Sequence, residues 1–474
     1  MTFPVSVRFR QWLPLALPLA VALLLRLFLV AHSERIGGDT LVYGDIARNW
    51  MQHGVYGFTW TVQGHPAVPR PTLIRLPGYP IFLAVCFFLF GIERYLAVVL
   101  VQVAVDLVTC LLVAALARRL FGPRAGLAAL WLACLCPFTA SYAAAPLTET
   151  LSLFCIALAL YTLERWRSAG ANLNRWLVGL GFSLAYAVLL RPEQGMLAVA
   201  IIPAMLWMVV PTPGRRFRSL LPVLLTALLT VAPLLPWTIR NERTFKVLQP
   251  LAPRFANDPG EDVPYGFQRW FRTWAIDFAS TEEVYWNYDG VPIEISNLPN
   301  RAFDSNAQYA STEALLREYN ETSNATPALD RRFNEIADER IHADPLRYYL
   351  FLPVARVLNM ALRPRTETMA TPLEWWNFHR WPRQTVFATL FAAINLGYLV
   401  AGGLGFYGWK KHLRPADRAL FFAMAGIILL RCVLLLTLDN SEPRYTLEFF
   451  PILILTASTL WRGHRSEDQA QATP

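Results

Sequence analysis

The stretch LPLALPLAVALLLRLFLV, residues 13–30, is apolar over a length sufficient to cross the hydrocarbon core of a lipid bilayer. Similar runs recur along the chain, in which 55% of the 474 residues are hydrophobic and 16% are charged. This composition predicts an all-α polytopic membrane protein with about ten transmembrane helices. We expect these helices near residues 13–30, 95–117, 125–142, 151–163, 177–190, 196–210, 220–237, 386–407, 419–438 and 449–461.

The positive charges indicate how the chain is oriented in the membrane. Most lysines and arginines lie in short links between apolar runs, so the net charge of +9 is a topology signal and does not indicate nucleic-acid binding. With a cytoplasmic amino terminus, the basic links are cytoplasmic, as the positive-inside rule requires. Links of mixed charge then face outward from the plasma membrane, into the periplasm in a Gram-negative cell. The basic links are 118–124, 165–175, 215–218, 410–414 and 462–465.

The first span carries a charge and is followed by a sequence that resembles a signal-peptidase site. Arg26 lies in the outer part of this span, where we expect its side chain to extend toward the lipid head groups. Ala31-His32-Ser33 fits a cleavage site, but the apolar run is long for a signal peptide and contains Arg26. We therefore expect the span to stay attached as a membrane anchor.

Two shorter apolar stretches, 77–91 and 346–362, are expected to lie along the external surface of the membrane. The second has apolar residues at helical spacing, which is typical of an interfacial amphipathic helix. These residues are Leu346, Leu350, Val354, Val357 and Ala361.

Three parts of the chain differ in composition. Residues 1–239 form an amino-terminal transmembrane module that includes the first external loop, 33–94. Residues 240–384 are polar and rich in Trp and Tyr, and they predict an external, partly helical cap that contains the interfacial helix. Within the cap, Thr326-Pro327 is typical of a helix start. Residues 385–474 form the carboxy-terminal transmembrane helices and a short cytoplasmic tail.

The external links contain the residue types needed for one kind of chemistry. An external active site cannot use cytosolic nucleotides, and the chain has no Gly-rich phosphate loop, so a lipid-borne donor fits better. Transfer from a lipid phosphate needs a carboxylate that takes a proton from the acceptor and cations that hold the departing phosphate. The seven histidines form no HxxxH pair, so the sequence does not support a metal site, and we expect no cofactor beyond the donor itself.

The first external loop supplies a carboxylate and a cation. Asp39 is the candidate general base, and its alternative role is to cap the helix that follows. Tyr43 belongs to the apolar face of that helix and is a candidate substrate contact, whereas Asp45 is expected on its solvated face. Arg75 is a candidate clamp for the donor phosphate, and its alternative partner is a lipid head group.

A second external carboxylate, Glu149, lies between two apolar spans. Its position next to an apolar run makes an isolated charge costly, which favours a site role over helix capping. Arg191 and Glu193 flank a proline at the end of another span. Arg191 is a candidate for substrate binding, with a local pair to Glu193 as the alternative.

Two further links carry candidate substrate-binding residues. Arg240 follows Trp237, and the same pair of residue types is typical of an anchor in the head-group zone. Glu442, Arg444 and Tyr445 lie between two late spans, and Arg444 is a candidate second cation for the phosphate. The alternative for Arg444 is a local ion pair with Glu442.

Four stretches resemble the GT-C membrane glycosyltransferases, particularly the bacterial group that includes lipid A aminoarabinose transferases, rhizobial lipopolysaccharide sugar transferases and relatives of protein O-mannosyltransferases. By this resemblance Asp39 is at the catalytic acidic position, Arg75 belongs to the basic segment that approaches the lipid phosphate, and Glu149 is at the second external acidic position. Thr40 departs from the Asp-Glu pair of protein mannosyltransferases, and Arg75 replaces the lysine of many relatives. The stretches are 39–56, 75–91, 147–149, and 236–241 together with 442–445.

The resemblance implies a GT-C-like helical bundle and an inverting glycosyltransferase. The donor would be a polyprenyl-phosphate sugar carrying a hexose or pentose, and the acceptor a glycan, lipid or protein of the cell envelope. A secondary transporter or flippase would also have about ten spans, but the ionisable residues here lie at span ends and the sequence has no internal repeat. A scaffolding protein would leave the carboxylates and arginines of the external links unexplained.

Overall fold

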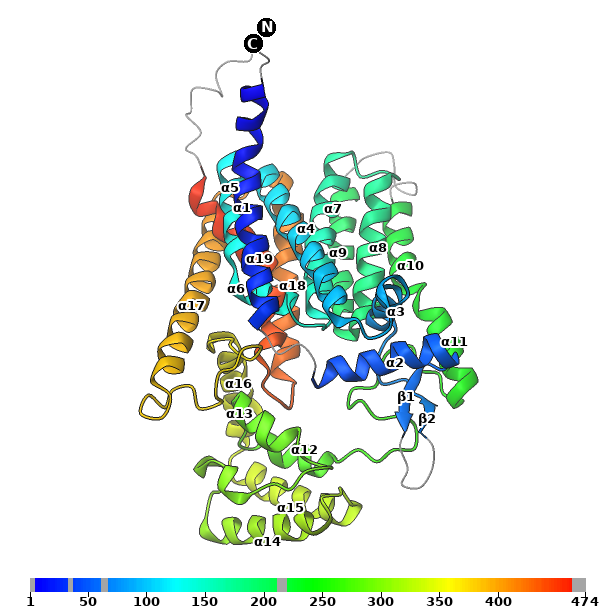
Figure 1. Cartoon of the computed structure of the whole chain (residues 1–474), viewed down its shortest axis with the longest axis vertical. Coiled ribbons are helices and arrows are strands. Elements are labelled where there is room, and N and C mark those ends of the chain that lie inside the picture. Colours follow the sequence, from blue (N-terminus) through cyan, green and yellow to red (C-terminus); the bar gives the residue numbers. More distant parts are fainter. Residues whose placement is uncertain (1–4, 33–36, 61–66, 211–219, 463–474) are drawn as a thin grey trace. The chain divides into compact units, whose positions relative to one another are not determined.

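The computed structural model describes residues 5–32, 37–60, 67–210 and 220–462 (Figure 1). The chain divides into two compact units, each described by itself below. The first comprises Met1–Ala256, Leu396–Ile427 and Leu447–Pro474, and the second comprises Asn257–Asn395 and Ile428–Thr446. Two long helices, α17 (Pro382–Lys411) and α18 (Arg418–Leu436), run from one unit into the other.

The first unit is a bundle of apolar helices. Helices α4, α5, α7, α8 and α10 pack in the pairs α4–α5, α4–α7, α7–α8 and α8–α10, and α1 packs against α4, α5 and α6 (Figure 1). The helices are α1 (Val5–His32), α2 (Asp39–His53), α3 (Gly78–Phe90), α4 (Tyr95–Phe121), α5 (Pro123–Leu135), α6 (Pro137–Ala143), α7 (Glu149–Ser168), α8 (Arg175–Leu190), α9 (Gly195–Val209), α10 (Leu221–Val231), α11 (Leu234–Phe245) and α19 (Phe450–Ala457).

Local chemistry explains how the central helices of this bundle begin and end. Helix α4 stops at Gly122, which has a φ of 98°, a conformation that favours glycine. Pro123 then opens α5, where its missing N–H is no loss. The tight α4–α5 turn brings the two helices together: a Cβ on Gly126 would lie 2.6 Å from the Cβ of Arg118.

Six helical segments in the described part of the chain are long and apolar enough to cross a membrane, or seven if the bent pair α5 and α6, with an angle of 54°, is one span. The expected number of about ten is therefore not confirmed. The other three expected spans correspond to α7, α8 and α19, which are helical but do not meet the same test of length and apolarity. The six segments are Pro14–His32, Tyr95–Phe121, Pro192–Val209, Leu221–Phe245, Pro382–Lys411 and Pro415–Leu436.

The two stretches expected along the membrane surface are both short helices. Helix α3 has 13 residues, and neither it nor α16 (Leu352–Leu362) is among the candidate spans. Helix α16 buries Arg356 together with Pro353 and Met360, whereas its apolar residues Val354 and Leu358 are exposed. An apolar face turned outward is the pattern expected of a helix that contacts lipid.

The second unit contains the remaining helices and its own core. The aromatic core includes Phe267, Trp270, Trp274 and Phe333. Thr326 caps α15 by accepting a hydrogen bond from the backbone N–H of Leu329, which confirms the predicted helix start. The helices are α12 (Tyr265–Arg272), α13 (Phe278–Ser280), α14 (Asn306–Thr322), α15 (Pro327–Ala343) and α16.

The prediction for Arg26 is wrong. The side chain is fully buried, and its guanidinium lies 2.7 Å from the carboxylate of Asp106 on α4. It also donates to the backbone carbonyl of Ala133 at 3.3 Å. A charge inside the bundle is tolerated when it is paired and hydrogen-bonded, and these partners satisfy that condition.

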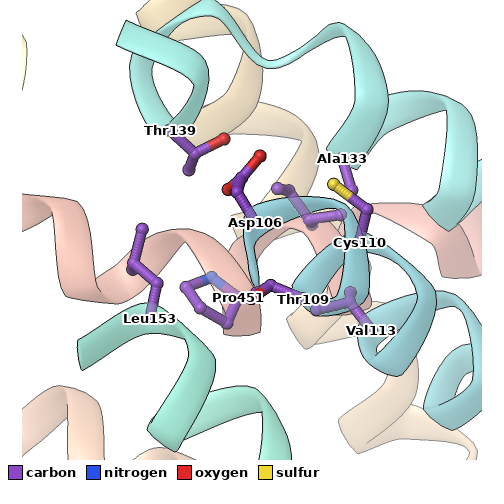
Figure 2. Close-up of a pocket in the computed structure, with 9 residues that line it drawn as sticks. Asp106, Thr109, Cys110, Val113, Ala133, Thr139, Leu153 and Pro451 are labelled. Carbon is purple, nitrogen blue, oxygen red and sulfur yellow. The ribbon is translucent and has the colours of Figure 1, made fainter. Parts of the chain in front are cut away.

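A cavity of about 20 Å³, large enough for one water molecule, lies beside Asp106 (Figure 2). Thr109, Cys110 and Thr139 also line it. None of its lining residues belongs to the predicted active site, so we assign the cavity to the packing around the buried ion pair.

Candidate active site

Asp39 and Arg75 form an ion pair in the loop region between α1 and α4. Arg75 Nη2 donates to Asp39 Oδ1 at 3.1 Å, and both side chains are about one-quarter exposed. Helix α2 begins at Asp39, but its N-cap is Gly38 and no side chain makes a capping hydrogen bond. The carboxylate of Asp39 is therefore directed to a cation within reach of solvent, and the capping alternative does not describe it.

Tyr43 lies one turn along α2 and contacts the same arginine. The centre of its ring is 5.8 Å from the guanidinium carbon of Arg75. Burial raises the pKa of Tyr43 to about 12; Arg75 and Arg191 act against this rise, whereas Asp39 and Glu149 add to it. The hydroxyl therefore stays protonated at neutral pH. Its pKa is influenced by the charges of both the Asp39–Arg75 pair and the Glu149–Arg191 pair.

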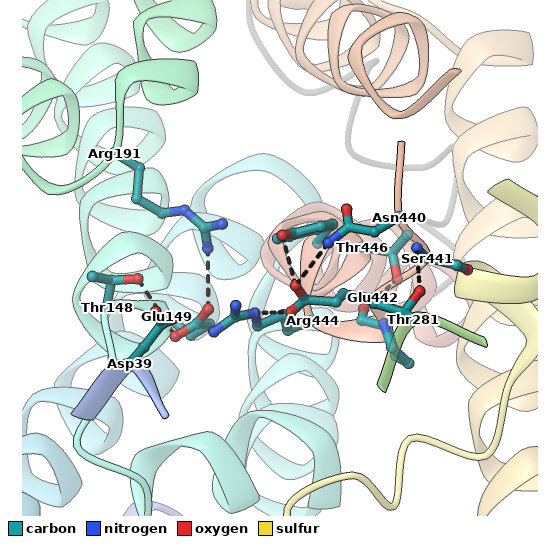
Figure 3. Close-up of polar contacts among 12 residues, drawn as sticks. Asp39, Thr148, Glu149, Arg191, Thr281, Asn440, Ser441, Glu442, Arg444 and Thr446 are labelled. Atoms are coloured by element: carbon teal, nitrogen blue, oxygen red, sulfur yellow. Dashed lines mark hydrogen bonds and ion pairs between the residues drawn. The ribbon is translucent and has the colours of Figure 1, made fainter. Parts of the chain in front are cut away.

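Arg191 lies close to three carboxylates, and Figure 3 shows its contact with Glu149. Its Nη1 lies 3.1 Å from Glu149 Oε1, and its Nε lies 2.7 Å from Glu193 Oε1. The same Nη1 is 3.9 Å from Glu448 Oε1. Glu149 is the first residue of α7, whose N-cap is Thr148 without a capping hydrogen bond, so Glu149 serves the ion pair. The local pair predicted for Arg191 and Glu193 is present, but Arg191 also reaches the buried Glu149.

Glu448 is a member of this cluster that sequence reasoning missed. It is buried, and it lies in the 3-10 segment Pro443–Phe449 just before α19. The signal that selected Glu149, a carboxylate next to an apolar run, is also present at Glu448. Glu442 and Arg444 lie in the same link, and they were selected from the sequence in place of Glu448.

Asp45 is expected on the solvated face of α2, but its carboxylate instead binds the β-hairpin that follows this helix. Strands β1 (Gly57–Trp60) and β2 (Val68–Pro71) pair antiparallel. Asp45 accepts hydrogen bonds from the backbone N–H of Thr59 at 2.6 Å and from its hydroxyl at 2.7 Å. Arg48 pairs with Asp45 as well. This network secures the strand that precedes the segment carrying Arg75.

Arg240 contacts the backbone of the same loop. It donates to the carbonyls of Thr72 and Tyr56, both at 2.7 Å. Its guanidinium also lies over the rings of Trp237 and Phe245, each at 5.2 Å. These contacts lie within the protein, so both the substrate contact and the head-group anchor stay predictions for Arg240.

Glu442, Arg444 and Tyr445 form a local cluster in the second unit (Figure 3). Arg444 pairs with Glu442, whose carboxylate also accepts a hydrogen bond from the hydroxyl of Tyr445 at 2.8 Å. The local ion pair considered from the sequence is present. A role of these three residues in substrate binding stays a prediction.

The described residues contain no group of three or more His, Cys, Asp or Glu side chains arranged to hold a metal ion. The cluster around Arg191 has several carboxylates, but a guanidinium occupies its centre.

Several solved structures resemble this chain, including the following two. One is the archaeal oligosaccharyltransferase AglB from Archaeoglobus fulgidus, in complex with an inhibitory peptide and a dolichol-phosphate; it is 14% identical, with 95% of this chain and 50% of AglB covered and a TM-score of 0.47. The other is ArnT from Cupriavidus metallidurans bound to undecaprenyl phosphate, 16% identical, with 94% of this chain and 78% of ArnT covered and a TM-score of 0.40. The chain thus spans about half the length of AglB. No curated protein matches it by sequence.

Part of the sequence also matches a family model. Residues 69–237 match the model described as dolichyl-phosphate-mannose-protein mannosyltransferase. The matched segment contains Arg75, Glu149 and Arg191, whereas Asp39 precedes it. Over this segment the match confirms the resemblance of the chain to the membrane glycosyltransferases of the protein mannosyltransferase type.

Proposed function

We propose that this protein is an inverting glycosyltransferase that transfers one hexose or pentose from a polyprenyl-phosphate carrier to an acceptor of the cell envelope. The reaction would take place at the external face of the plasma membrane, which is the periplasmic face in a Gram-negative host. The observation that carries the proposal is the partly exposed Asp39–Arg75 pair, with its 3.1 Å contact. The match of residues 69–237 to a family named for a polyprenyl-phosphate sugar donor supports it.

The pair supplies both groups that the reaction needs. As the acceptor oxygen bonds to the anomeric carbon, its proton passes to the carboxylate of Asp39. The bond between the anomeric carbon and the phosphate oxygen breaks on the opposite side, and the phosphate leaves with the electron pair. Arg75 stabilises the charge that develops on the leaving phosphate. Arg75 contacts the leaving phosphate while the neighbouring Asp39 carboxylate accepts the proton.

Glu149 and Arg191 complete the proposed site in the first unit. Glu149 is buried and paired, so it is held in one orientation, as suits a group that binds sugar hydroxyls. Arg191 holds Glu149 in place, and Tyr43 supplies a neutral hydroxyl whose pKa is influenced by both ion pairs. No observation favours the transporter or flippase alternative.

Purified protein tests the proposal directly. Detergent-solubilised enzyme is incubated with polyprenyl-phosphate hexoses and pentoses and with membranes from the host as the source of acceptor, and released polyprenyl phosphate is quantified by mass spectrometry. We expect Asp39→Asn to reduce release by a factor of about 10² to 10⁴, the usual size of a general-base contribution. Asp262→Asn, at an exposed position of the second unit, is the matched control. Full release with Asp39→Asn would remove the general base from the mechanism.

A further inference from the structure

Arg240 and Tyr56 connect helix α11 to the backbone of the segment that carries Arg75. The two hydrogen bonds that Arg240 donates, each 2.7 Å long, end on the carbonyl oxygens of Tyr56 and Thr72. The backbone N–H of Thr72 donates to the same Tyr56 carbonyl at 3.1 Å. One guanidinium therefore ties together the start of the hairpin and the chain that leaves it.

Tyr56 continues this connection to Arg75. Its hydroxyl donates to the backbone carbonyl of Arg75 at 2.9 Å. Burial raises the pKa of Tyr56 well above its ordinary value, so the hydroxyl keeps the proton that it donates. The ring is buried in a cluster with Ile46, Leu76 and Trp237. Because both ends of the segment from Thr72 to Arg75 are held, the backbone of Arg75 has little freedom to move.

We propose that Arg240 and Tyr56 are positioning residues, which hold the Arg75 guanidinium beside Asp39 through the backbone of the segment from Thr72 to Arg75. The inference rests on the proposed function for the role of Arg75, and it replaces the predicted substrate contact of Arg240. Arg240 acts through its planar fork, which reaches two carbonyls at once, and not through its charge alone.

Arg240→Lys distinguishes a contact with the donor phosphate from a role in positioning the loop. A lysine keeps the positive charge but cannot reproduce the forked geometry of the guanidinium. If Arg240 contacts the phosphate, Arg240→Lys should keep most of the activity. If Arg240 positions the loop, Arg240→Lys should behave like Arg240→Met, and both should lower kcat by about tenfold or more, since two hydrogen bonds are lost.

Tyr56→Phe tests the last step of the connection. It removes a single hydroxyl and keeps the buried ring, so we expect kcat/KM to fall about fivefold, as for the loss of one neutral hydrogen bond. In an Arg75→Ala background, the same substitution should have no further effect, because the residue through which it acts is gone. An equal loss in both backgrounds would overturn the proposal. Tyr309→Phe, at an exposed tyrosine, is the matched control.

Hydrogen exchange supplies a readout that does not depend on catalysis. Peptides that cover residues 70–76 should exchange faster in Arg240→Met and Tyr56→Phe than in the wild type, while peptides from α7 should be unchanged. Unchanged exchange in residues 70–76 would reject the positioning role. Faster exchange in a protein that transfers no sugar from any donor would keep the positioning role and reject the proposed reaction.

Discussion

Arg26 and Asp106 join α1 to α4 through an ion pair of 2.7 Å, and their side chains are 0% and 2% exposed. The pair explains how a charge can stay within an apolar bundle. It also means that each residue depends on the other, because removing one partner leaves an uncompensated buried charge.

A double-mutant cycle measures this dependence. We expect Arg26→Met and Asp106→Leu each to destabilise the protein by about 3–5 kcal/mol, the usual cost of breaking a buried pair, and the double variant to be more stable than either single one. The measurement is the thermal unfolding midpoint in detergent micelles. A double variant as unstable as the sum of the single ones would show that the two charges do not interact.

At Arg75, the length and shape of the cation are expected to matter less than its charge. In the proposed mechanism, Arg75→Gln removes the stabilisation of the leaving phosphate, and we expect kcat to fall by about 10² to 10³. Arg75→Lys should keep a large part of kcat, because an ammonium group can also bind phosphate as a point charge. Single-turnover assays with bound donor separate this effect from donor affinity. Equal losses in the two variants would contradict a role based on charge.

The carboxylates around Arg191 are predicted to differ in importance. Glu149→Gln should reduce transfer strongly, because Glu149 is buried and takes the 3.1 Å contact with Arg191. Glu193→Gln removes a more exposed partner, and such pairs contribute little, so we expect less than a threefold change. Steady-state kinetics on both variants at matched stability check the order. A larger effect of Glu193→Gln would reverse our assignment.

Gly44 tests how closely α2 approaches α4. A Cβ at this position would lie 1.9 Å from the hydroxyl oxygen of Tyr95. We therefore expect Gly44→Ala to destabilise the protein by about 1–3 kcal/mol through overpacking. Adding Tyr95→Phe removes the closest atom and should restore part of the loss in the unfolding midpoint. Gly403→Ala is the matched control, because a Cβ there meets no atom within 4 Å.

Because the pKa of Tyr43 is raised to about 12, we expect its hydroxyl to stay protonated throughout the pH range of an activity assay. Because burial raises the native pKa to about 12, above the unfolded value of about 10, the associated stabilisation is complete below pH 10 and is lost as the pH rises toward 12. Tyr43→Phe should therefore leave the shape of the kcat/KM profile unchanged between about pH 6 and 9. An alkaline limb that disappears in Tyr43→Phe would assign the titration to this hydroxyl.

Local patterns in the sequence predicted local structure well. Thr326-Pro327 marks a helix start because capping depends on neighbouring residues alone, and the Thr326 side chain caps α15 as expected. The outward apolar face of α16 follows equally from helical spacing. The expected span 95–117 corresponds to α4, which runs four residues further, to Phe121, because Arg118 and Arg119 continue the helix.

Long-range partners could not be predicted in the same way. Asp106 is 80 residues from Arg26, and a single sequence contains no signal that joins them. The contacts of Arg240 could not be predicted for a different reason. Its acceptors are backbone carbonyls, which every residue possesses, so no residue type in the sequence marks them. Glu448 carried the right signal, but its partner Arg191 lies in a distant part of the chain.

The three carboxylates that meet at Arg191 come from positions 149, 193 and 448 of the chain. During synthesis, Glu149 and Glu193 are added within about 42 residues of Arg191, but Glu448 follows only 255 residues after Glu193. A nascent chain halted before Glu448 would contain most of its helices and still lack the third carboxylate of the cluster around Arg191. The cluster around Arg191 would thus become complete only after the segment that carries Glu448 has been synthesised.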